Sequence, residues 1–394
     1  MDAGNVPSTR RAMRRARWVV LIAAASAWLA VACTSDGDAP PPTAPAPPVE
    51  EPAGTTAVGR DVELVLPPRT ALDPSIAERL SDRMRSLSED LPDGVDSLSV
   101  RLPEEPAFVP DLLELAAARG AALACVLGPD VAGIADRTAD RHGATTVCAL
   151  PATLPELDEE GDFEPTPAVR IDVPVTELGV LVGTAARTAV LTAVARADPD
   201  ADGPDADGTD PDADEPAAPA AEVPRVGLVL LGDELPSDRL REGVLTGLAG
   251  IEVVEVEDAD ASPLEALETL LAMGVQVVIV DGGPGAAEVV AALSGRSAIV
   301  APVDILAGAD TAEVVLGYRL RWEQVVRVVL DSFAGAGHLE APVLLGLGDD
   351  VLELEVGEDH PEVLAALMAA RAQLATRDDP RAPLLDEGPP AGAP

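Results

Sequence analysis

The chain of 394 residues contains no lysine, so its 27 basic residues are all arginine, and they stand against 69 acidic residues. The resulting net charge is −42 at pH 7. Proteins that bind DNA or RNA use lysine and arginine to neutralise phosphates. A chain this acidic would repel nucleic acid, which excludes nucleic acid as an expected partner.

Aromatic residues are also scarce, and histidine and cysteine occur three times each. The histidines lie in loop or helix-end contexts without partners at catalytic spacing; they are His142, His338 and His360. The sequence shows no triad or metal-ligand pattern, and no spacing favours the close pair of carboxylates that acid–base catalysis needs. We therefore expect a protein that is not an enzyme and that uses no metal and no cofactor.

The first 32 residues have the parts of a secretory signal. A segment with five arginines precedes an apolar stretch, Trp18–Ala32, that is too short to span a bilayer comfortably. Because Cys33 directly follows small residues, the segment is similar to a bacterial lipoprotein signal, which implies a lipid anchor on Cys33 at the extracytoplasmic face of the cell membrane. An ordinary signal peptide or an uncleaved anchor is the alternative. Residues 33–57 indicate a disordered tether.

The two remaining cysteines, Cys125 and Cys148, each lie in an apolar, strand-like run, with one helix-length segment between them. Strands connected in this way are often parallel neighbours, which would bring the two sulfur atoms close together. An exported protein can form a disulfide there. Two buried free thiols that behave as small apolar residues are the alternative.

Short apolar runs alternate with longer runs of helical spacing in two parts of the chain, residues 58–196 and 223–376. This alternation is typical of parallel sheets covered by helices. The segment Thr176–Ala195 is apolar nearly all round and indicates a buried helix, and Thr311–Ala334 is expected to form one long helix. The sequence thus predicts an α/β protein of two lobes, each a parallel sheet flanked by helices, with a ligand-binding cleft between them.

An acidic low-complexity segment, residues 197–222, separates the two predicted lobes. Its D-x-D-x-D-G start at Asp198 resembles a calcium-binding loop, but Thr209 stands where such a loop needs a glutamate. We interpret the segment as a disordered linker, with a calcium site as the alternative. Residues 377–394 are expected to be a disordered tail.

An ordered series of segments in the second half resembles one family. A strand leads into a helix with paired glycines (VGLVLLGDELPSDRLREGVLTGL), a second strand ends in a G-G-x-G turn (VIVDGGPGAAEVV), and a third ends in Val-Asp (APVDILAGADTAEVVLGYRLRWEQVV). The closing segments are PVLLGLGDDVLELEV and PEVLAALMAARAQL. Together they resemble the basic membrane protein (BMP) family of solute-binding lipoproteins, which includes purine nucleoside receptors of ABC transporters. The likeness covers residues 225–375 well and residues 61–195 in outline.

The resemblance implies the two-lobed fold of a type I periplasmic binding protein and a ligand site in its cleft. Asp304 matches the aspartate with which the family binds ribose hydroxyls, and Arg321 stands where the family has lysine. A glycine turn would let the backbone approach the ligand; it consists of Gly282, Gly283 and Gly285. The alternatives are a capping or loop role for Asp304, a solvated position for Arg321 and a simple tight turn for the glycines.

The first lobe departs from the family in the segment after its first strand. The family has an Asp-Lys-Ser-Phe-Asn run there, whose ring stacks on a nucleobase and whose amide hydrogen-bonds it. In this chain the same place holds Asp73, Pro74, Ser75, Ile76 and Ala77. Both the ring and the amide are absent, and the aspartate, a candidate ligand residue, has helix capping as its alternative role.

Two aromatic residues are candidates to replace the missing ring. Tyr318 and Trp322 are expected to lie one turn apart on the helix that carries Arg321, where they would offer a stacking face. Core packing is the alternative role for both side chains.

We interpret the chain as an extracytoplasmic solute-binding lipoprotein of an ABC importer. It would bind a small ligand, nucleoside-like by resemblance, between its lobes and deliver it to a membrane permease. The alternative is a degenerate binding-protein fold that acts as an envelope structural, interaction or sensory lipoprotein. The missing ring and amide favour this alternative, whereas the retained Asp304, Arg321 and glycine turn oppose it.

Overall fold

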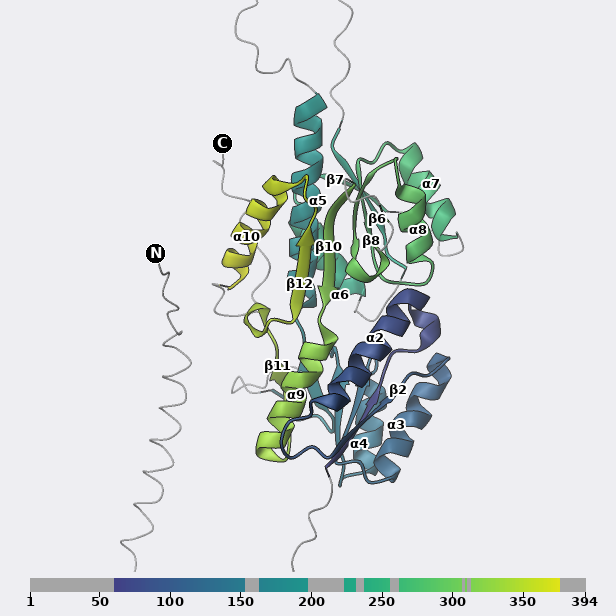
Figure 1. Cartoon of the computed structure of the whole chain (residues 1–394), viewed down its shortest axis with the longest axis vertical. Coiled ribbons are helices and arrows are strands. Elements are labelled where there is room, and N and C mark those ends of the chain that lie inside the picture. The colour runs from purple at the N-terminus through teal and green to yellow at the C-terminus, as the bar shows by residue number, and fades with distance from the viewer. Residues whose placement is uncertain are drawn as a thin grey trace, which may run out of the picture. The chain divides into compact units, whose positions relative to one another are not determined.

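The computed structural model describes residues 60–152, 163–197, 223–231, 237–255, 262–306, 309 and 313–375. The expected signal peptide with Cys33, the tether, the tail, and the acidic linker beyond Ala197 lie outside these described residues. The described residues belong to one compact unit, whose helices and strands are drawn in Figure 1.

The first lobe is built on a parallel sheet with the strand order β11-β5-β4-β3-β1-β2. Because successive side chains of a strand point to opposite faces, the sheet buries two apolar surfaces. One packs on α3 and α4, and the other packs on α2 and α9. The strands are β1 (Asp61–Val65), β2 (Ser97–Arg101), β3 (Leu123–Leu127), β4 (Thr146–Leu150), β5 (Val169–Asp172) and β11 (Val343–Leu344). The helices are α2 (Pro74–Ser86), α3 (Val109–Ala118), α4 (Ala132–Arg141) and α9 (Trp322–Ala336).

The second lobe has the strand order β12-β10-β9-β8-β6-β7, and its edge strand β12 runs antiparallel to β10. Helices α7 and α8 cover one face, and α5, α6 and α10 cover the other (Figure 1). The strands are β6 (Arg225–Val229), β7 (Glu252–Glu255), β8 (Val277–Val280), β9 (Ala298–Pro302), β10 (Val314–Leu320) and β12 (Leu352–Val356). The helices are α5 (Val175–Ala197), α6 (Ser237–Gly247), α7 (Pro263–Ala272), α8 (Ala286–Leu293) and α10 (Pro361–Ala375).

Among the described elements, the chain passes between the lobes three times: from β5 to α5, from β10 to α9, and from β11 to β12. The predicted boundaries, 58–196 and 223–376, are therefore not those of the lobes. Helix α5 packs on the second lobe, where it contacts α6 and β10. Helix α9 buries its apolar face in the core of the first lobe, and β11 pairs with β5. Long-range burial and strand pairing, which no local pattern encodes, decide this division.

The expected single helix Thr311–Ala334 is wrong over its first part. Residues Val314–Leu320 form β10, which pairs with β9 on one side and β12 on the other. The helix α9 begins only at Trp322, after Arg321 with φ −80° and ψ 77° breaks the extended run. An apolar run this short fits a buried strand and a buried helix alike, and the two neighbouring strands decide in favour of the strand.

Cys125 and Cys148 are joined by a disulfide in this structure. They are register partners on the neighbouring parallel strands β3 and β4, with their Cα atoms 4.5 Å apart. Both residues are buried in the core of the first lobe. The bond therefore joins two central strands of the sheet within its apolar core.

Helix α5 is long and apolar enough to cross a membrane by length and composition alone, but 56% of its most apolar window is buried inside the protein. Two glycine pairs bring it against α6; they are Gly179 and Gly183 on α5, and Gly243 and Gly247 on α6. A Cβ atom at any of the four would overlap backbone atoms of the facing helix. The apolar composition of α5 thus reflects close packing in a protein core.

Candidate ligand-binding site

The candidate site lies where the carboxyl ends of strands from both lobes meet. In the first lobe, β1 leads to α2, which begins after Asp73. In the second lobe, β8 leads through residues 282–285 to α8, and β9 leads to the 3-10 turn η4 (Val303–Ile305). The backbone N–H of Asp73 donates to the Gly282 carbonyl oxygen at 3.1 Å, which joins the two lobes directly. Carboxyl ends of parallel strands are where α/β proteins bind ligands.

The Asp73 carboxylate connects the amino ends of two helices. Its Oδ1 accepts from the Ser75 backbone N–H at 3.0 Å and from the Ser75 hydroxyl at 2.7 Å, which caps α2. Its Oδ2 accepts from the Ala287 N–H at 3.2 Å, in the first turn of α8 on the other lobe. Both helix dipoles favour a negative charge here. Asp73 is thus a helix cap and an interlobe contact at once.

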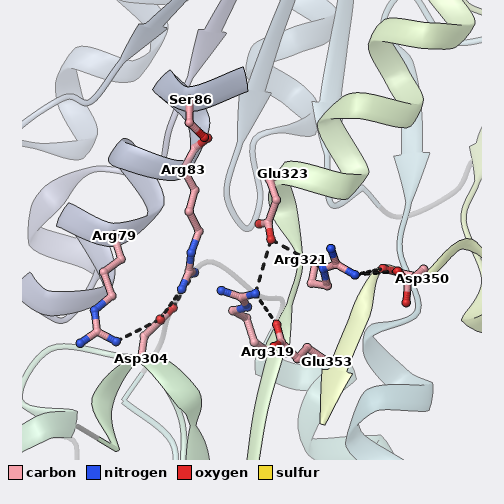
Figure 2. A network of polar contacts seen from close by, with 9 residues as sticks. All are labelled: Arg79, Arg83, Ser86, Asp304, Arg319, Arg321, Glu323, Asp350 and Glu353. Atoms are coloured by element: carbon pink, nitrogen blue, oxygen red, sulfur yellow. Dashed lines mark hydrogen bonds and ion pairs between the residues drawn. The ribbon is translucent and has the colours of Figure 1, made fainter. Parts of the chain in front are cut away.

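Asp304 accepts charged hydrogen bonds from two arginines of the other lobe. Its side chain lies in η4, and its residue is only 6% exposed. Arg83 of α2 donates from Nη1 to Oδ2 at 2.9 Å and from Nη2 to Oδ1 at 2.6 Å, and Arg79 donates from Nη1 to Oδ1 at 3.3 Å (Figure 2). Charge-assisted, two-pronged contacts of this kind are among the stronger hydrogen bonds in proteins.

The electrostatic environment of Arg83 favours its charged form. Partial burial alone would lower the pKa of Arg83. The hydrogen bond and charge of Asp304, together with the charges of Glu323 and Glu353, outweigh burial and raise that pKa above the ordinary arginine value. Arg83 therefore stays a cation throughout the accessible pH range.

A second group of charges ties the crossing segments together (Figure 2). Arg319, at the end of β10, pairs with Glu323 of α9 and with Glu353 of β12. Arg321 lies in the crossing between β10 and α9, where it donates to Asp350 Oδ2 at 2.6 Å. The expected helical position of Arg321 is therefore wrong, since Arg321 precedes α9 and pairs with Asp350 of the segment between β11 and β12. Its role toward a ligand stays a prediction.

The predicted glycine turn faces α2 across the site. Gly282 accepts the hydrogen bond from Asp73, and the Gly283 N–H donates to Asp281 Oδ1 at 3.2 Å. Gly285 precedes α8 with φ +84°, a conformation that favours glycine. The turn thus brings backbone close to the opposite lobe, as a tight strand-to-helix connection.

Tyr318 and Trp322 do not form the predicted stacking face. Tyr318 lies on β10, is 2% exposed, and donates its hydroxyl to the Val280 carbonyl oxygen at 2.9 Å. Trp322 starts α9, is also 2% exposed, and packs in the same apolar core. The helix on which one turn would have separated them does not exist, because the chain is a strand at Tyr318. Both rings serve the core.

The structure brings Asp73 into contact with Gly282 at the start of α2 and Asp304 into contact with two residues further along α2, Arg79 and Arg83, which the sequence analysis did not identify. The sequence contains a pattern that could have identified them, because two arginines four residues apart on the first helix lie on one helix face. Only the tertiary structure shows that this face meets Asp304.

A small apolar cavity lies elsewhere, inside the first lobe between the sheet and α9. Within the described ranges, no three His, Cys, Asp or Glu side chains gather as metal ligands.

No family model matches the chain, and no curated protein matches it significantly. Several solved structures, in contrast, match the fold of this chain. A solute-binding protein of an ABC transporter system from Aeropyrum pernix K1 has a TM-score of 0.53 at 16% identity, over 79% of this chain and 86% of that one. A carbohydrate transporter solute-binding protein from Agrobacterium radiobacter, in complex with D-arabinose, has a TM-score of 0.50 at 13% identity, over 79% of this chain and 99% of that one.

A transcriptional activator of the comK gene from Bacillus halodurans is equally similar, with a TM-score of 0.53 at 14% identity over 80% of this chain and 97% of that one. Because the matched proteins include both solute-binding proteins and a regulator, the comparison identifies a fold and not an activity. The chain has the two-lobed α/β fold of the periplasmic binding proteins.

Proposed function

We propose that this chain is the extracytoplasmic solute-binding component of an ABC importer, and that it binds a small solute between its lobes. One observation carries the proposal: charged side chains of both lobes, Arg79 and Arg83 on one and Asp304 on the other, converge at the carboxyl ends of the strands. Three crossing segments join the lobes and would act as the hinge for opening and closing.

The groups at the junction suit a solute rich in hydroxyls. A carboxylate such as Asp304 accepts hydroxyl protons, and arginine donates to hydroxyl oxygens. A nucleoside-like ligand rests on the BMP resemblance alone, and the positions of the family's ring and amide hold Ile76 and Ala77, which are buried. The similar structure from Agrobacterium radiobacter, which holds D-arabinose, also supports a ligand with sugar hydroxyls. We therefore place a sugar or sugar-like part of the solute against Asp304.

A titration of intrinsic fluorescence tests this function. In a chain that starts at residue 33 with Cys33→Ser, Trp322 is the sole tryptophan, and it directly follows the hinge residue Arg321. We expect a saturable change in emission, with a matching rise in melting temperature, for one class among sugars, nucleosides and bases. A flat emission and an unchanged melting temperature with every class would count against solute binding.

The lipid anchor is the second part of the proposal, and it rests on the amino-terminal signal. Cys33→Ser should release the protein from membranes into the soluble fraction during fractionation of the producing bacterium. The unchanged sequence, processed in parallel, should stay with the membranes. Retention of the Cys33→Ser protein on membranes would contradict anchoring through Cys33.

A second function is favoured by a specific observation: the interlobe charges are already paired within the chain. Asp73 and Asp304 both accept hydrogen bonds across the junction. A protein whose lobes are held together by their own side chains in this way would suit a structural or sensory role in the envelope. A solute response in the titration above separates the importer component from this alternative.

A further inference from the structure

The contact between α2 and Asp304 has the geometry of a carboxylate receptor. Arg79 and Arg83 lie on one face of α2 and donate to the same carboxylate (Figure 2). Arg83 uses both terminal nitrogens, one for each oxygen of Asp304. An arginine fork matches a carboxylate in this two-pronged way, whereas a hydroxyl presents only one acceptor atom.

The neighbouring acids Glu323 and Glu353 act on Arg83 through their charges, but their hydrogen bonds go to another arginine. Glu323 and Glu353 both accept from Arg319, and Glu323 also lies 3.7 Å from Arg321. Separation of the lobes would take Asp304 away from Arg79 and Arg83 and leave two cations directed at one point. The side chains of Arg79 and Arg83 are 42% and 27% exposed while the lobes are in contact, so a solute can reach them.

We propose that the solute is a hydroxy acid of sugar size. Its carboxylate takes the place of Asp304 on Arg79 and Arg83, and its hydroxyls donate to the freed Asp304 carboxylate. The exchange is noncovalent, because one carboxylate leaves the guanidinium groups as another arrives and no proton moves. This inference rests on the proposed function and names the solute class for the same site.

Matched pairs of a sugar and its acid test the inference by isothermal titration calorimetry at pH 7 and low salt. The pairs are ribose and ribonate, glucose and gluconate, and glucose and glucuronate, with adenosine and uridine beside them. The sample is the chain from residue 33 onward with Cys33→Ser. We expect one acid to bind at least about tenfold more tightly than its neutral partner. Added salt should reduce this preference, because part of it is the attraction between charges.

Variants of the receptor show whether the preference comes from α2. Arg83→Gln should abolish the preference for the acid, and Arg83→Lys, which keeps the charge and loses the fork, should retain part of it. Arg79→Gln should independently reduce the preference for the acid. Arg327→Gln is the matched control, since Arg327 pairs with Asp90 at 3.0 Å within the first lobe, and it should keep the full preference. Urea unfolding of each variant confirms that the protein tested is folded.

The outcomes separate this inference from the function on which it rests. If a neutral sugar or nucleoside binds as tightly as every acid, the acid receptor is refuted and solute binding stands. An acid preference that survives intact in folded Arg83→Gln refutes the receptor as well. If no solute of the panel gives heat or a thermal shift, both the solute class and the proposed function are overturned.

Discussion

At the scale of single residues, the acidic side chains of this chain differ by the donors placed around them. Asp304 is buried against two guanidinium groups, and Asp73 has backbone donors of two helices. Glu114 on α3 instead accepts from Arg141 Nη1 at 2.8 Å and pairs with His142 Nε2 at 2.9 Å. In each case the local donors, and not the excess of acid in the chain, set the role of the carboxylate.

Glu114 gives a pH prediction with a definite sign. Burial alone would raise the pKa of Glu114, but the hydrogen bond from His142 and the charge of Arg141 outweigh it and lower that pKa. A lowered pKa in the folded state adds stability above the ordinary glutamate value, and this stability is lost as the pH falls through the lowered value. Glu114→Gln should therefore cost less than about 1 kcal/mol at pH 7, because the pair is partly exposed.

Urea unfolding of the Glu114→Gln protein and the unchanged protein from pH 7 down to pH 3 measures this effect. The difference in the free energy of unfolding should shrink as the solution becomes acidic. Glu105→Gln, a change at an exposed glutamate, serves as the control and should show little difference at any pH. A Glu114→Gln penalty that stays constant with pH would show that the charge of Glu114 is not its cause.

At the scale of elements, α5 and α6 pack backbone to backbone where glycines of the two helices face each other. A Cβ on Gly243 would lie 2.9 Å from the Gly179 Cα and would overlap the Thr176 carbonyl oxygen. A Cβ on Gly179 would meet Gly243 in the same way. Backbones packed at this distance leave no flexible atom that can give way.

Gly243→Ala should therefore destabilise the protein although alanine is the better helix former. We expect a loss of about 1–3 kcal/mol or more from overpacking. Gly335→Ala on α9 is the matched control, since nothing lies within 4 Å of its added Cβ, and it should be neutral or slightly stabilising. Urea unfolding followed by circular dichroism measures both, and an equal response of the two variants would disprove the close contact between α5 and α6.

At the scale of the whole molecule, the three crossing segments are tied to one another. The Leu345 N–H donates to the Asp172 carbonyl oxygen at 3.0 Å, and the Arg321 N–H donates to Val351 at 2.7 Å. Arg239 of α6 also donates to the Asp172 carboxylate at 2.6 Å. A hinge built from such segments moves as one group, so the contacts at α2 and η4 decide how far apart the lobes lie.

Removal of the interlobe ion pairs should open the ligand-free protein. In Arg79→Gln/Arg83→Gln the Asp304 carboxylate loses both cations, and a buried charge without partners favours exposure to water. Small-angle X-ray scattering should then give a larger radius of gyration than that of the unchanged protein. Arg327→Gln, which breaks an ion pair inside one lobe, should leave the radius unchanged. An equal radius in all three proteins would mean that other contacts hold the lobes together.

The sequence by itself determined the class of fold, because the alternation of short apolar runs and helical runs is a local property. It also pointed to the glycine turn and Asp304, since each closely follows a strand, and to Asp73 through the family resemblance. It failed at Val314–Leu320, whose apolar run suits a helix as well as a strand until β9 and β12 are placed on either side.

Only the tertiary structure decided which lobe α5, α9 and β11 join, since strand pairing and burial act between residues far apart in the chain. It also decided what Asp304 contacts. Arg79 and Arg83 lie more than 200 residues before it, and no pattern of neighbouring residues can encode a contact across that separation. The pairing of these charges comes from the way the two lobes meet.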